Sequence, residues 1–175
     1  MEETKVIVEA IIFASESPLS IDRIREILPD VEKSEITRLL QELIDEYETK
    51  RGGFLLQEVA GGFQFRTRAD LSFWISKLMR GKAAALSHAA METLAIVAYK
   101  QPVVKSEIDR IRGVDGGSSL KGLLEKKFVR IMGRKDVPGK PMMYGTTKKF
   151  LEVFNLKDLS ELPTLKELKD LQEGS

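Results

Sequence analysis

Two short strands joined by a tight turn are predicted from the stretch Gly133-Arg134-Lys135-Asp136-Val137-Pro138-Gly139-Lys140-Pro141-Met142-Met143-Tyr144-Gly145-Thr146-Thr147. Pro138 presets φ near −65° and Gly139 accepts a positive φ, so residues 137–140 suit a type II turn. Pro141 has no amide hydrogen to donate, which places it at a sheet edge or just before the second strand. The spacing alone predicts a surface hairpin.

The composition is that of an ordinary soluble globular protein, with 31% charged and 42% hydrophobic residues among 175. This length suits one domain or two small ones. No apolar run approaches the roughly 20 residues that span a bilayer, and the acidic N-terminus is unlike a signal peptide. The absence of cysteine agrees with a reducing compartment, so we expect a cytoplasmic protein without membrane contact.

Charge is unevenly distributed along the chain. Residues 1–81 carry 15 acidic and 11 basic side chains, whereas residues 82–154 carry 7 acidic and 14 basic ones. The two parts are therefore expected to face different partners, and only the second is suited to an anion.

The first helix is expected over residues 5–16, with one apolar face at helical spacing formed by Ile7, Ala10, Ile11 and Ala14. Ser20 is a candidate N-cap for a second helix that stops at Pro29, and Ser34 for a third. A hairpin then follows, with strands at 54–59 and 63–67, and a short helix at 71–79. Three helices followed by a hairpin is the order of a winged helix.

The second part of the chain repeats the first with a shift of 84 residues. Pro18 then falls on Pro102 and Leu19 on Val103, in a gap-free match across three helices. We therefore predict a mainly α protein with small β-hairpins, built as two winged-helix domains in tandem. The expected domains are 1–81 and 82–154, followed by a leucine-rich extension at 155–175.

The extension has leucine at every third position from 156 to 171, interrupted by Pro163. A period of three drifts around a helix of 3.6 residues per turn. We expect a short helical piece that docks on the second domain and then a partly disordered tail.

Catalytic chemistry is poorly supported. His88 is the only histidine and there is no cysteine, so Cys–His pairs and cysteine zinc sites are impossible within one chain. No glycine-rich phosphate-binding motif occurs, and residues 115–119 are best explained as a turn with a serine cap. We expect no enzyme, no metal and no cofactor.

A winged-helix DNA-binding transcriptional regulator is the alternative function. The third helix of the first domain is acidic and would repel phosphate, and that of the second offers few base-reading side chains. Indirect or weak nonspecific DNA contact and a merely solvated basic face are about equally supported for the second domain, at Lys121, Lys126, Lys127, Arg134 and Lys140.

The helix expected over Ala89–Tyr99 is apolar almost all round. Such a helix is buried on all sides, and a domain this small offers cover for only part of its surface. The remainder is covered either within the chain or by another protein, and the sequence leaves both open.

Several stretches resemble one known family, the segregation and condensation protein B family. The opening hairpin, residues 92–102, residues 107–114 and residues 150–163 carry the resemblance. It implies two winged-helix domains and a homodimer formed through the first. It also implies binding of the kleisin subunit, segregation and condensation protein A, which bridges the SMC ATPase heads. The expected role is chromosome condensation and segregation, without catalysis, in association with the nucleoid.

Given that resemblance, we expect a kleisin helix to lie against the second domain. Its candidate contacts are Leu94, Ala98, Tyr99, Pro102, Val103, Lys135, Pro138 and Tyr144. For the dimer, the candidates are apolar residues of the first hairpin and the following helix, namely Phe54, Phe63, Phe65 and Trp74.

Overall fold

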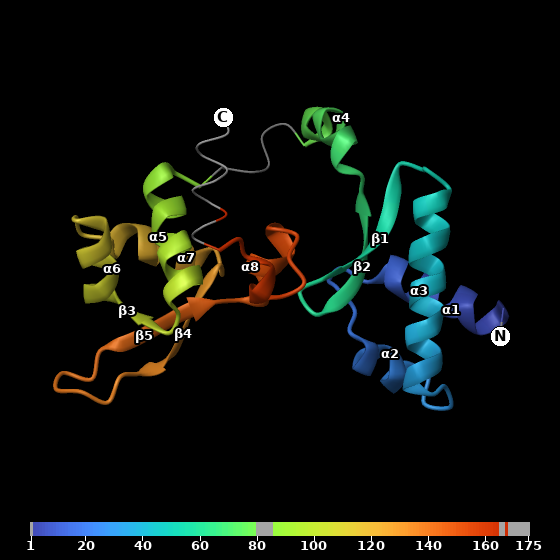
Figure 1. Cartoon of the computed structure of the whole chain (residues 1–175), viewed down its shortest axis with the longest axis horizontal. Coiled ribbons are helices and arrows are strands. Elements are labelled where there is room, and N and C mark those ends of the chain that lie inside the picture. The colour runs from blue at the N-terminus through green and yellow to red at the C-terminus, as the bar shows by residue number, and fades with distance from the viewer. Residues whose placement is uncertain (1, 80–85, 165–166, 168–175) are drawn as a thin grey trace. The chain divides into compact units, whose positions relative to one another are not determined.

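The computed structural model describes residues 2–79, 86–164 and 167 (Figure 1). The chain divides into two compact units, Met1–Ala83 with Asn155–Ser175, and Ala84–Phe154. The boundary predicted after residue 81 lies outside the described residues, as do residues 165–166 and 168–175 of the extension predicted to be partly disordered. In the described part of the chain, no helix has the length and apolarity that a membrane crossing requires.

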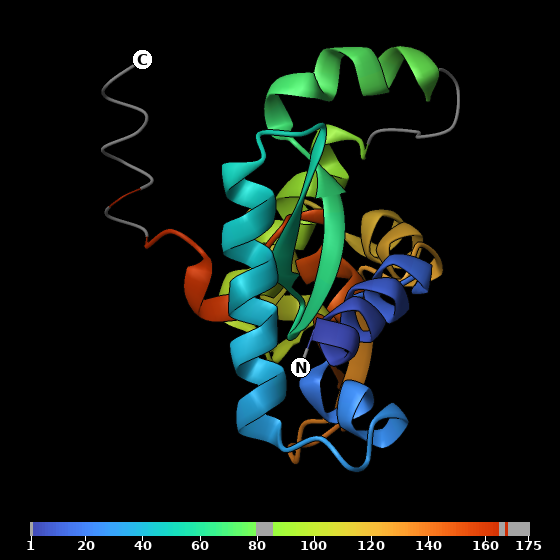
Figure 2. The ribbon, with the colours of Figure 1, turned by 90° about the vertical axis from the view of Figure 1, so that its right-hand side faces the viewer.

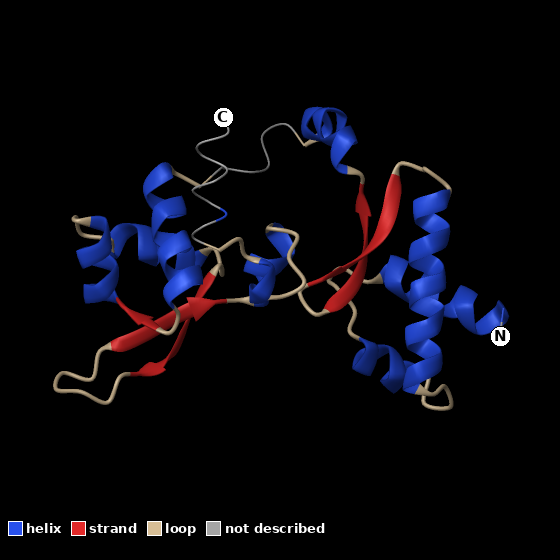
Figure 3. Cartoon of the chain, viewed as in Figure 1, coloured by secondary structure: helices blue, strands red, loops and turns tan. Residues whose placement is uncertain are grey.

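The first unit contains three helices followed by an antiparallel hairpin (Figure 3). Its elements are α1 (Glu2–Ala14), α2 (Ile21–Ile27), α3 (Lys33–Thr49), β1 (Phe54–Val59), β2 (Gly62–Thr67), the 3-10 helix η1 (Ala69–Leu71) and α4 (Ser72–Leu78). The long helix α3 lies beside the hairpin (Figure 2). Apolar side chains from the three helices and β1 form its core, namely Val8, Ile12, Ile24, Ile36, Leu39, Leu40, Leu43 and Leu56.

The two predicted serine caps have different outcomes. Ser20 caps α2, and its hydroxyl accepts a hydrogen bond from the Arg23 amide. Ser34 lies inside α3, because the N-cap is Glu32, whose side chain makes no capping bond. Val31 precedes this cap and packs against the same core as Ile36, which fixes the chain entry as a hydrophobic staple does.

The apolar face predicted for the first helix points the wrong way. Val8 and Ile12 are the residues buried in the core, while Ile7, Ala10 and Ala14 lie on the exposed side. α1 is apolar on both faces, so periodicity could not identify the side that α3 and β2 cover.

The second unit repeats the arrangement of the first. Its elements are α5 (His88–Lys100), β3 (Val103–Val104), α6 (Lys105–Arg112), α7 (Gly117–Glu125), β4 (Val129–Arg134), β5 (Met142–Thr146) and α8 (Lys148–Val153). Its sheet has the strand order β3-β5-β4. Val103 pairs with Tyr144 in this sheet, and Leu19 makes the equivalent bridge to Phe63 in the first unit. The prediction of two winged helices in tandem is therefore confirmed.

The hairpin between β4 and β5 has the predicted turn. The Lys140 amide donates to the Val137 carbonyl at 2.9 Å, and Gly139 has φ of 84°, as a type II turn requires. β5 begins at Met142, directly after Pro141.

The segment that follows the second unit packs on the first unit, contrary to prediction. The amides of Ala60 and Gly61, in the β1–β2 turn, donate to the carbonyls of Leu156 and Lys157 at 2.8 and 3.1 Å. Lys157 also pairs with Glu58 at 3.3 Å. A turn with two unpaired amides offers the returning chain hydrogen-bonding partners that leucine spacing does not reveal. The segment ends in the 3-10 helix η2 (Leu159–Glu161).

Candidate interaction surfaces

Two of the four predicted dimer residues belong to one aromatic cluster. Phe54 and Phe65 meet edge to face with ring centres 5.8 Å apart, and Tyr47 of α3 lies 4.8 Å from Phe65. Phe13 of α1 reaches the same ring at 6.2 Å. Phe13 and Phe54 remain exposed, so the cluster continues from the core to the surface.

The other two predicted dimer residues lie elsewhere in the first unit. Phe63 is half-buried at the bridge to Leu19 and lines a groove described below. Trp74 lies on α4, where its ring is 5.2 Å from that of Phe73 and beneath the Lys77 ammonium. α4 exposes apolar side chains all along its length, including Phe73, Trp74, Leu78 and the following Met79.

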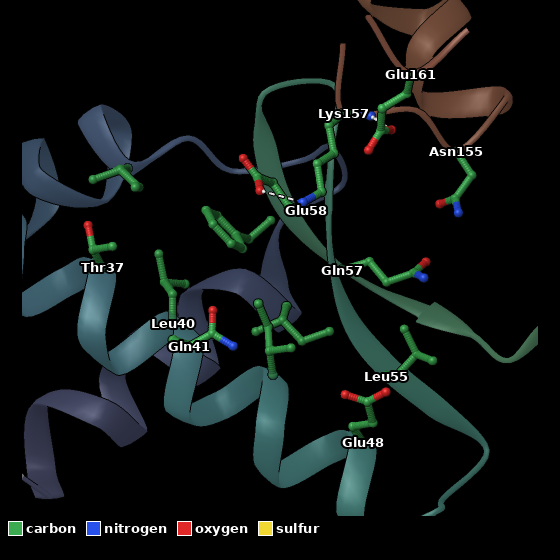
Figure 4. A pocket seen from close by; sticks show the side chains of 14 residues that line it. Thr37, Leu40, Gln41, Glu48, Leu55, Gln57, Glu58, Asn155, Lys157 and Glu161 are labelled. Carbon is green, nitrogen blue, oxygen red and sulfur yellow. Dashed lines mark hydrogen bonds and ion pairs between the residues drawn. The ribbon is translucent and has the colours of Figure 1, made fainter. Parts of the chain in front are cut away.

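A groove of about 600 Å³ runs between α3, β1 and the returning segment of the first unit (Figure 4). Thr37, Leu40 and Gln41 line one wall, and Leu55 and Gln57 line the other (Figure 4). Lys157 also lines the groove; its ammonium pairs with Glu58, and its amide donates to the Glu161 carboxylate at 2.7 Å (Figure 4). Apolar, amide and charged side chains all contribute to the lining of this groove.

The predicted kleisin contacts on α5 divide between core and surface. Leu94, Ala98 and Val103 are buried in the core of the second unit, which removes them from the candidate surface. Tyr99 and Pro102 are exposed. Met91 and Ala95 are also exposed and precede Tyr99 at intervals of four, so the three share one face of α5.

A residue of β4 that the sequence did not single out extends this face. A Cβ placed on Gly145 would lie 2.2 Å from Met132 Sδ and 2.8 Å from Gln101 Oε1, so these two side chains meet over the glycine. Met132 is exposed. We define the α5 surface as Met91, Ala95, Tyr99, Pro102 and Met132.

A hydrogen-bond network joins the end of α5 to β5. Gln101 Oε1 accepts from the Thr146 amide at 2.8 Å, while Gln101 Nε2 donates to Thr146 Oγ1 at 3.0 Å and to the Ala98 carbonyl at 3.1 Å. These bonds hold the sheet against the helix that carries most of the α5 surface. A glutamine just after a helix is too common to reveal this contact in sequence.

The wing residues do not form one patch. Tyr144 is half-buried, and its hydroxyl lies 3.9 Å from Met142 Sδ. Pro138 is exposed at the turn. Lys135 pairs with Glu107 of α6 at 2.9 Å, and this bond, with one from the Val104 amide, lowers the pKa of the Glu107 carboxyl. Lys135 therefore fixes the wing to α6.

The five predicted DNA contacts are all exposed but lie in two groups. Lys121, Lys126 and Lys127 lie on or just after α7, before β4 begins. Arg134 ends β4 at its other end and Lys140 lies in the turn that follows, where the Arg134 guanidinium donates to the Lys140 carbonyl at 3.1 Å. A six-residue strand spans roughly 20 Å, so the two groups cannot contact the same phosphate.

Metal-binding chemistry is not evident. Among the residues that the structure describes, no group of three or more His, Cys, Asp or Glu side chains is arranged to hold a metal ion. His88 lies at the exposed start of α5, after its cap Ser87, and pairs with Glu92 at 3.2 Å.

Comparisons with known proteins point to one family. The model of a family described as "Segregation and condensation complex subunit ScpB" matches residues 6–165. The segregation and condensation protein B of Syntrophotalea carbinolica is 46% identical over 99% of this chain and 87% of its own length. A homologue of that protein from Coxiella burnetii is 42% identical, over 97% of this chain and 82% of its own. A solved dimer of the ScpB N-terminal domain with an ScpA peptide is 29% identical over 44% of this chain and 95% of that chain, with a TM-score of 0.40.

Proposed function

Because the chain belongs to the ScpB family of segregation and condensation complex subunits, we propose that it is a non-enzymatic homodimer that binds the kleisin subunit, segregation and condensation protein A. Through the kleisin it joins the SMC ATPase and supports chromosome condensation and segregation. It works in the cytoplasm, at the nucleoid. The first unit carries the dimer contact and the second the kleisin contact.

The α5 surface is the observation that carries the kleisin proposal. Met91, Ala95 and Tyr99 form an exposed apolar row along two turns of a helix whose other face is the core of the unit. An amphipathic helix can lay its own apolar face along such a row. Tyr99 and Met132 are the side-chain types that most often anchor interfaces.

Electrostatics adds direction to this contact. The second unit carries the excess of basic side chains, and Lys100 is exposed beside the row at the end of α5. A basic rim around an apolar centre accelerates and orients the approach of an acidic segment. Leu94, Ala98 and Val103 support this surface from the core and make no contact with the kleisin.

The test is titration calorimetry of the kleisin's middle segment into the full chain. Ala95→Glu places a charge in the middle of the row and is expected to weaken binding at least about tenfold, or about 1.4 kcal/mol. Tyr99→Ala removes an anchor and is expected to cost a similar amount. Ser118→Glu is the matched control, since it adds the same charge at an exposed position of α7 in the same unit.

Unchanged affinity of both α5 variants would remove the kleisin site from this surface. Failure of the natural chain to bind the segment would overturn the kleisin proposal itself. Circular dichroism of each variant shows that a loss of binding is not a loss of fold.

A sequence-reading regulator is the weaker candidate. α7 holds the place of a recognition helix, yet among its residues Ser118, Lys121 and Glu125 are the exposed side chains. One lysine and one serine beside a glutamate provide little for base edges to pair with. We therefore propose that contact with DNA is either indirect or weak and nonspecific. The affinity of a weak nonspecific contact is expected to fall steeply as the salt concentration rises.

A further inference from the structure

α1 leaves one whole apolar face uncovered. Its outward residues follow helical spacing and are all exposed, with Val6 at 58% and Phe13 at 73% of their full accessible area. The opposite face holds Val8 and Ile12, which are fully buried. We define the α1 stripe as Val6, Ile7, Ala10, Phe13 and Ala14.

The stripe is electrically neutral because the charges of the helix are used elsewhere. Lys5 pairs with Glu46 of α3 at 2.8 Å, and Glu9 accepts a hydrogen bond from the Tyr47 hydroxyl. No other charged residue occurs in α1 after Glu3. A charged partner surface would lose its hydration on this stripe without gaining an opposite charge. A neutral apolar surface carries no such desolvation cost.

The order of side chains along the stripe makes it complementary to itself. In an antiparallel pair of α1 helices centred on Ala10, position 6 of one helix lies opposite position 14 of the other, and 7 lies opposite 13. The bulky Val6 thus meets the small Ala14, Ile7 meets Phe13, and Ala10 meets its own copy.

We propose that the homodimer forms through antiparallel contact of the two α1 stripes, with the two-fold axis beside Ala10. A two-fold interface needs a patch that fits its own copy, which this order supplies. The inference rests on the proposed homodimer and assigns it a surface. It moves the dimer contact from the hairpin, where sequence placed it, to α1, the first helix of the same unit.

The aromatic cluster gives this interface its second part. Phe13 lies at the end of the stripe and touches Phe65, which in turn touches the exposed Phe54. These ring contacts therefore connect the α1 stripe to the start of β1. Phe54 is expected to contribute at the rim of the interface and Ala10 at its centre.

The first test is light scattering of the full chain with Ala10→Glu. A carboxylate beside the axis would face its own copy, so the mass is expected to fall from twice 19.7 kDa to 19.7 kDa. Ser34→Glu is the matched control, because Ser34 is exposed on α3 outside the stripe, and it is expected to stay dimeric. Circular dichroism confirms that both variants fold.

The second test uses the absence of cysteine from the natural chain. Ala10→Cys introduces one thiol, and mild oxidation is expected to link two copies through it, because a disulfide forms only when the two Cα atoms lie within about 7 Å. Ser34→Cys, treated in the same way, is expected to remain unlinked.

The outcomes separate this inference from the function on which it rests. A natural chain that is dimeric, with Ala10→Glu still dimeric and Ala10→Cys unlinked, would overturn the α1 interface and leave the homodimer standing. A natural chain that is monomeric at all concentrations would overturn both. A monomeric Ala10→Glu with a linked Ala10→Cys supports both.

Discussion

At the scale of single residues, Gly62 has the least room for a side chain among the described glycines of the first unit. A Cβ at this position would lie 2.8 Å from the Pro18 carbonyl carbon and 2.9 Å from that of Leu19. These atoms are main chain and cannot rotate away. The bridge between Leu19 and Phe63 therefore requires a glycine at position 62.

Gly62→Ala is expected to destabilise the first unit by about 1–3 kcal/mol, because the added methyl pushes the bridge apart. Gly122→Ala is the matched control, since its Cβ meets nothing within 4 Å inside α7. That change is expected to stabilise its helix by up to about 1 kcal/mol. Urea unfolding of both variants measures the two effects, and equal behaviour would contradict the expectation.

At the scale of elements, one ion-pair cluster ties α1 to α3. The Glu46 carboxylate accepts from Lys5 at 2.8 Å and pairs with Lys50 at 2.6 Å. The bonds from Lys5 and then Lys50 lower the pKa of Glu46 from 4.5 to about 2. In the same region, the bond to Glu9 raises the pKa of the Tyr47 hydroxyl to about 12.

This cluster predicts how stability depends on pH. The folded pKa of Glu46 lies below its unfolded value, so its contribution is fully present above pH 4.5 and is lost as pH falls toward about 2. The pair is partly exposed, so we expect no more than about 1 kcal/mol at neutral pH. Urea unfolding of the natural chain and Glu46→Gln should show a difference that shrinks over this range; a constant difference would refute the assignment.

At the scale of the whole molecule, the first structural unit is built from two separate stretches of the chain. Residues after Phe154 follow the second unit in sequence but belong to the first. Leu156 and Lys157 satisfy the amides of Ala60 and Gly61, and Lys157 pairs with Glu58. During synthesis, the last segment of the first unit therefore leaves the ribosome after the whole second unit.

Truncation after residue 154 is expected to loosen the first unit and spare the second. Two backbone hydrogen bonds are lost, which corresponds to about 2 kcal/mol. Hydrogen exchange is expected to quicken at the β1–β2 turn and to stay unchanged in α5 and β4. Lys157→Ala removes the ion pair alone and should have a smaller effect. Faster exchange in the second unit would place the segment where sequence predicted it.

Sequence predicted the features that depend on neighbouring residues. The turn at residues 137–140 follows from one proline and one glycine, and the cap at Ser20 from one hydroxyl. The two winged helices follow from matching patterns 84 residues apart. These signals are local or repeated, so the physical chemistry of short segments is enough to read them.

The sites were less predictable because core and surface apolar residues look alike in sequence. Leu94 and Met91 lie on one helix with similar chemistry, yet packing buries the first and exposes the second. The Gln101–Thr146 bonds, and the approach of both Met132 and Gln101 to Gly145, involve residues far apart in the chain. No periodicity carries such information.

The sequence by itself determined the two winged helices, the wing turn and the division of charge, since each rests on local conformational preference or on composition. Only the tertiary structure decided which face of α1 and of α5 is covered and where the C-terminal segment docks. Which side chains are buried depends on how all the helices and strands of a unit pack around its core. In α1 that packing buries Val8 and Ile12 and leaves the α1 stripe exposed.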